Sequence, residues 1–175
     1  YGAYLKHLKK TAQKELVIEP ANFEINANKH EVYNSDADRL IKNIEGDILY
    51  LDPPYNERQY GANYHMLNTI AEYKPFVPNG KTGLRRYERS VWCSRRKVHA
   101  VFDTLLKNAR FRYIFFSYNN EGLMPVSNIE QIMRKYGKYD LAQIGYRRFK
   151  ADKAANRRHY ADGTREYLHI LEKNA

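Results

Sequence analysis

The chain has 175 residues, a net charge of +10 and a single cysteine, Cys93. This length is typical of one domain with a real hydrophobic core, and one cysteine excludes an internal disulfide framework and favours a reducing, cytoplasmic location. No apolar run is long enough for a membrane span, and the first residues, YGAYLKHLKK, lack the apolar core of a signal peptide. The six histidines are scattered singly, which argues against a zinc cluster.

Helical and strand-like patterns alternate along the first half of the chain. Three segments have apolar residues at roughly helical spacing: 3–16, 37–44 and 62–73. The short run 31–34 and the continuous apolar run 47–51, "DILYL", predict two strands, and the second is expected to be buried. Residues 74–97 follow as a long basic segment without clear periodicity, which we interpret as an insertion.

The alternation continues in the second half. Apolar spacing predicts a helix over 98–109, and the apolar run 112–118 predicts a strand. Ser127 and Glu130 form a capping-box pattern that opens a further helix, which Gly137 is expected to end. The expected buried face of that helix consists of Ile129, Ile132, Met133 and Tyr136. The last strand-like runs, 139–149 and 165–172, predict an antiparallel hairpin at an edge of the sheet.

The order of these elements predicts the fold class. Strands that alternate with helices favour an α/β fold with a mostly parallel sheet and helices on both faces. Three strand candidates run directly into polar clusters, at 35–38, 52–56 and 119–121. The carboxyl ends of parallel strands meet at one edge of a sheet, where ligands bind, so we expect the three clusters to line one crevice.

The positive charge is concentrated in two segments. Residues 80–97 contain seven basic residues and one acidic residue, residues 146–166 are similarly rich, and both contain interleaved aromatic rings. Cations that neutralise phosphates and rings that stack on bases are typical of a nucleic-acid contact surface. The plainer alternative is a pair of solvated loops.

The motif Asp52-Pro53-Pro54-Tyr55 follows the apolar run 47–51. Two adjacent prolines remove backbone donors and fix the chain direction, so Asp52 and Tyr55 are expected at the rim of the sheet. A carboxylate oxygen and a proline carbonyl can together accept both hydrogens of one exocyclic amine, which stabilises the positive charge that develops as the nitrogen attacks. Tyr55 would stack on the base, which must first leave its duplex. Taken singly, Asp52 could merely cap a turn and Tyr55 could be a core aromatic.

These residues resemble a known family. The stretches "GDILYLDPPYNERQYGANYHMLNTIAEY", "YIFFSYNNEGLM" and "YRRFKAD", with "EYLHILE", are similar to the adenine-specific DNA methyltransferases of bacterial restriction–modification systems. The resemblance covers about residues 1–172. It implies a partial Rossmann-like methyltransferase sheet, S-adenosylmethionine as the cofactor and double-stranded DNA as the partner.

The resemblance also implies roles for individual residues. Asp52 and Pro53 would hold the amino group of a flipped adenine, and Pro54 and Tyr55 complete the catalytic set. The expected cofactor contacts are Asp36, Ala37 and Asp52. The expected DNA or target-strand contacts are Asn56, Arg58, Tyr60, Lys81, Arg85, Arg86, Arg95, Arg96, Arg147, Arg148 and Lys150. Asn119 and Asn120 are either structural or pocket-lining.

One expected feature of the family is missing from the sequence. None of the nine glycines forms a Gly-x-Gly turn, which in the family cradles the methionine end of the cofactor. Our hypothesis is that residues 1–175 are the C-terminal portion of a longer catalytic domain, whose missing N-terminal part is a partner, so that the chain alone has low activity. Methylation of an RNA base or a protein glutamine, and a non-catalytic nucleic-acid-binding module, remain alternatives.

Overall fold

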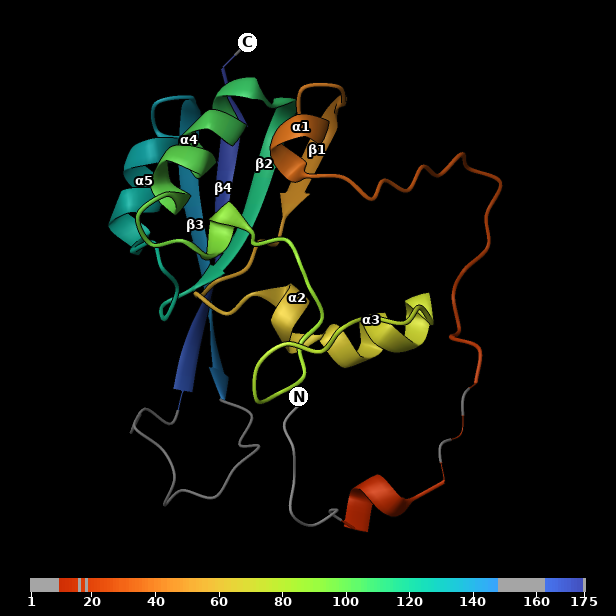
Figure 1. Cartoon of the computed structure of the whole chain (residues 1–175). Helices are drawn as coiled ribbons and strands as arrows, with labels where there is room; N and C mark the ends of the chain where they lie inside the picture. The colour runs from red at the N-terminus through yellow and green to blue at the C-terminus, as the bar shows by residue number, and fades with distance from the viewer. Residues whose placement is uncertain (1–9, 16, 18, 148–162, 175) are drawn as a thin grey trace.

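A computed structural model describes residues 10–15, 17, 19–147 and 163–174 (Figure 1). Its strands are β1 (Glu45–Leu51), β2 (Arg110–Asn119), β3 (Gly137–Arg147) and β4 (Gly163–Lys173). Its α-helices are α1 (Ala37–Leu40), α2 (Tyr60–Asn63), α3 (His65–Glu72), α4 (Val98–Asn108) and α5 (Val126–Met133), and short 3-10 turns span Lys10–Gln13 and Val91–Cys93. Within these described ranges, every helix is too short or too polar to cross a membrane.

The four strands form one sheet in the order β1-β2-β4-β3. β1 pairs with β2 in parallel, whereas β4 pairs antiparallel with both β2 and β3. The expected α/β class and the antiparallel β3–β4 hairpin at an edge of the sheet are confirmed, whereas the expectation of a mostly parallel sheet is only partly confirmed by the described strands. β4 lies between β2 and β3, so two of the three pairings are antiparallel.

One face of the sheet carries the hydrophobic core. Alternate residues of β2, namely Ile114, Phe116 and Tyr118, are fully buried on this face. The helices α4 and α5 cover it with side chains at the predicted helical spacing: Val98, Phe102, Leu105, Leu106, Ile129, Ile132 and Met133. Burial of each large apolar side chain contributes about 1.5–3 kcal/mol, so this layer accounts for much of the stability.

The opposite face of the sheet is less covered than predicted. α1 and α5 both contact α4, so these three helices form a single layer on the core face (Figure 1). The expected helices on the second face are not found among the described residues. Ile48 and Tyr50 of β1 point to this face and are 63% and 61% exposed, so the expectation that 47–51 is a buried strand is wrong.

Several local expectations also need correction. Residues 31–34 are exposed and form no strand, and the helix expected over 37–44 is the four-residue α1. The helix expected over 62–73 is divided at Tyr64 into α2 and α3. Most of the helix expected over 3–16 lies outside the described residues, and Lys10–Gln13 form a 3-10 turn.

The capping-box prediction for α5 is also wrong. The helix begins at Val126 after Pro125, which places Ser127 inside the first turn with no side-chain cap bond. Gly137 begins β3 instead of ending the helix. A Cβ at this position would overlap the main-chain carbonyl of Glu172 on β4, so glycine is required by a close approach of two strands.

Candidate active site

The side chain of Asp52 lies exposed directly after the carboxyl end of β1. Pro53, Pro54 and Tyr55 are half-buried beside it, and the hydroxyl of Tyr55 donates a hydrogen bond to Oδ1 of Asp52 at 2.7 Å. The carboxylate is therefore held in one orientation while it stays accessible from solvent.

Tyr55 is itself fixed by β2 and the loop that follows it. Its hydroxyl lies 2.9 Å from Oγ of Ser117, and its ring packs edge-on against Tyr118 with the ring centroids 5.1 Å apart. Its main-chain carbonyl accepts the N–H of Leu123 at 2.9 Å and the hydroxyl of Tyr118 at 3.3 Å. Burial raises the pKa of Tyr55, so the phenol stays protonated and able to donate.

These contacts bring together two of the three predicted polar clusters. The loop after β1 and the loop after β2 share hydrogen bonds through Tyr55, as expected for neighbouring parallel strands. The cluster at 35–38 is different because no strand precedes it, and none of the hydrogen bonds described for it reaches the other two. The single crevice lined by all three clusters stays a prediction.

Glu166 is a residue at this edge of the sheet that sequence reasoning missed. It lies opposite Asn119 in the β2–β4 register. Burial raises the pKa of Glu166, the neighbouring Asn119 side chain lowers it, and the carboxylates of Asp52 and Glu121 raise it again. A second carboxylate thus lies within electrostatic range of Asp52. Only the antiparallel pairing of β4 reveals this proximity, since 114 residues separate Asp52 from Glu166 in the chain.

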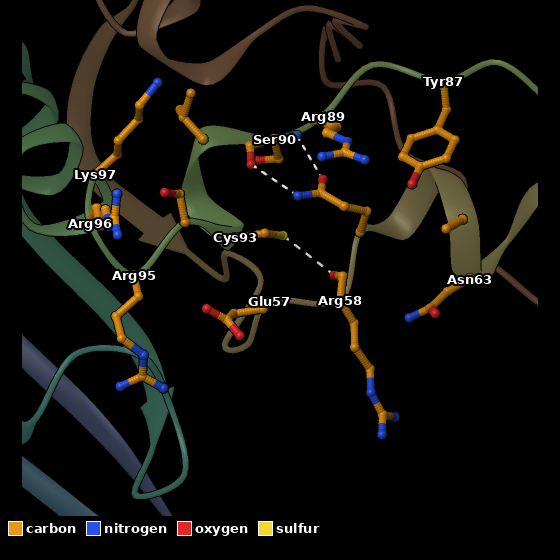
Figure 2. Close-up of a pocket in the computed structure, with 14 residues that line it drawn as sticks. Glu57, Arg58, Asn63, Tyr87, Arg89, Ser90, Cys93, Arg95, Arg96 and Lys97 are labelled. Atoms are coloured by element: carbon orange, nitrogen blue, oxygen red, sulfur yellow. Dashed lines mark hydrogen bonds between the residues drawn. The ribbon is translucent and has the colours of Figure 1, made fainter.

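A basic hollow of about 940 Å³ lies beside the motif (Figure 2). We use this name for the cavity between the segment after Tyr55 and the segment before α4. The charged side chains that line it are Glu57, Arg58, Arg89, Arg95, Arg96 and Lys97. Five cations against one carboxylate give the hollow an excess of positive charge that suits phosphate groups.

The two walls of the basic hollow are joined by specific hydrogen bonds (Figure 2). The N–H of Ser90 donates to Oε1 of Gln59 at 2.8 Å, and Nε2 of Gln59 donates back to the carbonyl of Ser90 at 3.3 Å. The buried thiol of Cys93 donates to the carbonyl of Arg58 at 3.4 Å. These bonds fix the basic segment 89–97 next to the chain that leaves the motif.

The predicted DNA contacts are distributed unevenly. Arg58, Arg95 and Arg96 line the basic hollow, whereas Lys81 and Arg86 are exposed outside it. Arg85 makes intramolecular contacts instead: it forms an ion pair with Glu72 at 2.5 Å and lies over the ring of Phe76.

The remaining predicted contacts make local interactions or lie outside the described side chains, so their DNA-binding roles stay predictions. Oδ1 of Asn56 accepts the N–H of Arg58 at 2.9 Å in a local turn, and Tyr60 opens α2 with its ring edge-on to Tyr64. Asn120 accepts the N–H of Arg165 at 2.9 Å, which favours a structural role for this asparagine. Arg147 ends β3 with its side chain undescribed, and Arg148 and Lys150 lie outside the described residues.

The residues predicted to contact a cofactor lie at the start of α1. Oδ1 of Asp36 caps this helix by accepting the N–H of Asp38 at 3.0 Å, and Ala37 is its first residue. Oδ1 of Asp38 is buried and has no hydrogen-bond partner among the described residues. Burial raises the pKa of Asp38, and the Asp36 carboxylate raises it further. An N–H group of a bound ligand could supply the missing donor, and the cofactor contacts expected at Asp36 and Ala37 stay a prediction.

Comparison with known proteins agrees with the fold and the motif. Residues 1–135 match the sequence profile of the D12 class N6 adenine-specific DNA methyltransferases. The chain is 64% identical over 173 residues to the type II methyltransferase M.NlaIII of Neisseria lactamica, and 41% identical over 171 residues to M.CviAII of Paramecium bursaria Chlorella virus 1. It is 40% identical over 179 residues to M.FokI of Planomicrobium okeanokoites. No solved structure matches the chain.

The α/β sheet and the Asp-Pro-Pro-Tyr motif at the end of β1 thus define a chain of the methyltransferase class. More specifically, it belongs to the family of D12 class N6 adenine-specific DNA methyltransferases. These alignments include 98–99% of this chain but only 52% of M.NlaIII, 50% of M.CviAII and 27% of M.FokI. The chain therefore spans about half of the length of M.NlaIII and M.CviAII and about a quarter of that of M.FokI.

Proposed function

We propose that this chain carries the catalytic motif and part of the DNA-binding surface of an enzyme that methylates the exocyclic amino group of adenine in DNA. The observation that carries the proposal is the exposed carboxylate of Asp52, held by the Tyr55 hydroxyl at 2.7 Å directly after a strand of the sheet. Family membership supports adenine as the base and DNA as the substrate.

We assign roles to the motif residues from the family resemblance and from the position of Asp52 beside Tyr55. An oxygen of Asp52 and the main-chain carbonyl of Pro53 would accept the two hydrogens of the adenine amino group once the base has left the duplex. Both acceptors are fixed before the base arrives, so they stabilise the positive charge that develops on the nitrogen without further reorganisation. S-adenosylmethionine would supply the electrophilic methyl group. Because Asp52 is exposed, the proton that the methylated nitrogen releases can pass to water.

Tyr55 would combine two roles in this scheme. Its ring offers a surface for the flipped base, and its hydroxyl, between Ser117 and Asp52, orients the carboxylate. Glu166 adds negative potential near the nitrogen where positive charge develops. Pro54 keeps the turn between Asp52 and Tyr55 rigid.

Two parts of the scheme concern binding. The basic hollow would hold phosphates of the target strand through Arg58, Arg95 and Arg96, and the segment 74–97 that contributes one wall is our candidate for target recognition. Asp36, Ala37 and Asp38 would hold the adenosine end of the cofactor. The sequence has no Gly-x-Gly turn for the methionine end, so we expect the chain alone to bind the cofactor weakly and turn over slowly.

The test is transfer of tritiated methyl groups to duplex DNA by the full-length protein, with duplex RNA as the competing substrate. Asp52→Ala should abolish transfer and leave salt-sensitive DNA binding largely intact. Asp47→Ala, which removes an exposed carboxylate within β1, should leave transfer within about twofold of the parent, because solvated surface groups contribute little. Transfer to RNA alone, or full activity of the Asp52 variant, would overturn the proposal.

A further inference from the structure

A buried tyrosine on β2 contacts the last residue of the Asp-Pro-Pro-Tyr motif. Tyr118 is fully buried, and its ring packs edge-on against Tyr55 with the ring centroids 5.1 Å apart. The same ring stacks on Phe116 with the centroids 5.2 Å apart. The Tyr118 hydroxyl donates to the main-chain carbonyl of Tyr55 at 3.3 Å and accepts the N–H of Leu123 at 3.1 Å. Tyr118 therefore contacts both the ring and the main chain of Tyr55.

The packing of the core does not by itself require the hydroxyl of Tyr118. Phe116, the preceding residue on the same face of β2, is also fully buried and carries no polar side-chain atom. A buried hydroxyl costs free energy unless it is hydrogen-bonded, and the bonds that offset this cost lead to the carbonyl of Tyr55 and the N–H of Leu123. Burial raises the pKa of Tyr118, so its hydroxyl keeps the proton that it donates to the motif.

The N–H of Leu123 has two acceptors. It lies 2.9 Å from the carbonyl of Tyr55 as well as 3.1 Å from the Tyr118 hydroxyl. Removal of the hydroxyl would leave this N–H bonded, whereas the carbonyl of Tyr55 would lose one of its two donors. The hydroxyl therefore determines where the Tyr55 carbonyl lies more than it satisfies the buried groups of the loop.

The loop after β2 restricts the position of the Tyr118 ring. The N–H of Glu121 donates to the side-chain oxygen of Asn119 at 3.0 Å, and the N–H of Gly122 donates to the main-chain carbonyl of Asn119 at 3.2 Å. A Cβ at Gly122 would overlap the ring of Tyr118, so this turn packs its main chain directly against the ring. Glycine is required here because a residue with a side chain would not permit that approach.

We propose that Tyr118, with Gly122 packed against its ring, is a positioning residue for methyl transfer. It fixes the main chain of Tyr55 and thereby the turn that carries the Asp52 carboxylate and the Pro53 carbonyl. The inference rests on the proposed function, in which these two oxygens bind the adenine amino group. The two prolines restrict rotation between Asp52 and Tyr55, so a shift of the Tyr55 main chain also displaces both acceptors.

Tyr118 acts on the reaction through Tyr55. A fully buried side chain presents no surface to adenine or to the cofactor, so its hydroxyl affects the rate of the bound complex and not the binding of DNA. A misplacement of about 1 Å can lower the rate about a hundredfold. The Tyr55 carbonyl keeps its bond to Leu123 in Tyr118→Phe, so the motif shifts by less and we expect kcat to fall by about threefold to thirtyfold.

The experiment measures the transfer of tritiated methyl groups to duplex DNA by the full-length protein and its variants, together with unfolding in urea. Tyr118→Phe should lower kcat by this factor, keep the KM for DNA within about twofold of the parent and leave the urea midpoint nearly unchanged. Gly122→Ala, which displaces the ring, should lower kcat at least as far. The matched control is Phe102→Leu, which alters another buried ring packed on Phe116, with the centroids 4.4 Å apart. It should lower the urea midpoint and keep kcat within about twofold of the parent.

The outcomes separate a positioning role from a structural one. A kcat for Tyr118→Phe equal to that of the parent would overturn the proposal, even where Gly122→Ala fails to fold. An equal loss of kcat in Phe102→Leu, or a raised KM for DNA with kcat unchanged in Tyr118→Phe, would overturn it as well. Absence of transfer by the parent, or full activity of Asp52→Ala, would contradict the proposed function itself. An active parent whose kcat is insensitive to Tyr118→Phe would leave that function standing and remove only the positioning role.

Discussion

The hydroxyl of Tyr55 and Oδ1 of Asp52 lie 2.7 Å apart across the two prolines of the motif, and the same hydroxyl lies 2.9 Å from Ser117 on the next strand. The tyrosine of the motif is thus a link between the carboxylate and the sheet as well as an aromatic surface. Asp52 owes its orientation to a side chain on β2, which is reached through Tyr55.

Tyr55→Phe keeps the ring packed against Tyr118 and removes the hydroxyl that links Asp52 to Ser117. We expect kcat for methyl transfer in the full-length protein to fall by about tenfold to a hundredfold, because a carboxylate misplaced by a fraction of an ångström loses much of its effect. Ser117→Ala should act in the same direction but less, since Tyr55 can still reach Asp52. The KM for DNA and the thermal stability should change little. A kcat equal to that of the parent in both variants would show that the link has no role.

Arg95 and Arg96 lie in the basic hollow, whereas Arg85 is held by Glu72 and Phe76. Fluorescence anisotropy of duplex DNA at several salt concentrations should separate them. Each of Arg95→Ala and Arg96→Ala should weaken binding and reduce the slope of log K against log salt by about 1, as expected for one lost phosphate contact.

Arg85→Ala is the matched control for this experiment. It should leave the salt slope unchanged and lower the free energy of unfolding by about 1–2 kcal/mol through the lost ion pair and ring contact. A reduced slope for Arg85→Ala, with parental slopes for the other two variants, would show that the phosphate contacts lie outside the basic hollow.

His169 makes the stability depend on pH. It is fully buried on β4, its Nδ1 lies 2.9 Å from the hydroxyl of Tyr139, and burial lowers its pKa from 6.5 to about 4. The unfolded chain binds a proton at this residue below about pH 6.5 and the folded chain does not, so the free energy of unfolding should fall as pH drops from about 6.5 to 4. The loss from this group amounts to about 3 kcal/mol.

Urea unfolding between pH 7.5 and 4 measures this dependence. The comparison variant is His169→Gln, whose stability should change less with pH than that of the parent over this range. His30→Gln alters an exposed histidine and should retain the parent's dependence. Identical pH profiles for all three proteins would mean that His169 binds protons equally in the folded and the unfolded chain.

Gly137 and Gly145 both lie on β3 but have different surroundings. A Cβ at Gly137 would overlap the Glu172 carbonyl, whereas a Cβ at Gly145 has nothing within 4 Å. We expect Gly137→Ala to lower the free energy of unfolding by about 2–4 kcal/mol and Gly145→Ala to change it by less than about 0.5 kcal/mol. Chemical denaturation of both variants is the measurement. Equal stabilities would show that β3 and β4 can move apart at Gly137 without a loss in the free energy of unfolding.

The sequence by itself determined the elements whose signals are local. The apolar spacing of 98–109 predicted α4, the apolar run 112–118 predicted β2, and the prolines after 47–51 predicted an exposed Asp52 at a strand end. Periodicity and proline restrictions act over a few residues, so they can be recognised without knowledge of the rest of the chain. Family-specific residues around the motif then indicated the methyltransferase class.

Only the tertiary structure decided which segments meet. It placed β4 between β2 and β3, brought Glu166 close to Asp52, joined Tyr55 to Ser117, and paired Arg85 with Glu72. These contacts depend on strand register and on packing between residues far apart in the chain. Neither can be recognised from a short stretch of sequence. The same reason explains the errors at 31–34 and 47–51, because a strand forms and becomes buried only where another part of the protein pairs with it or covers it.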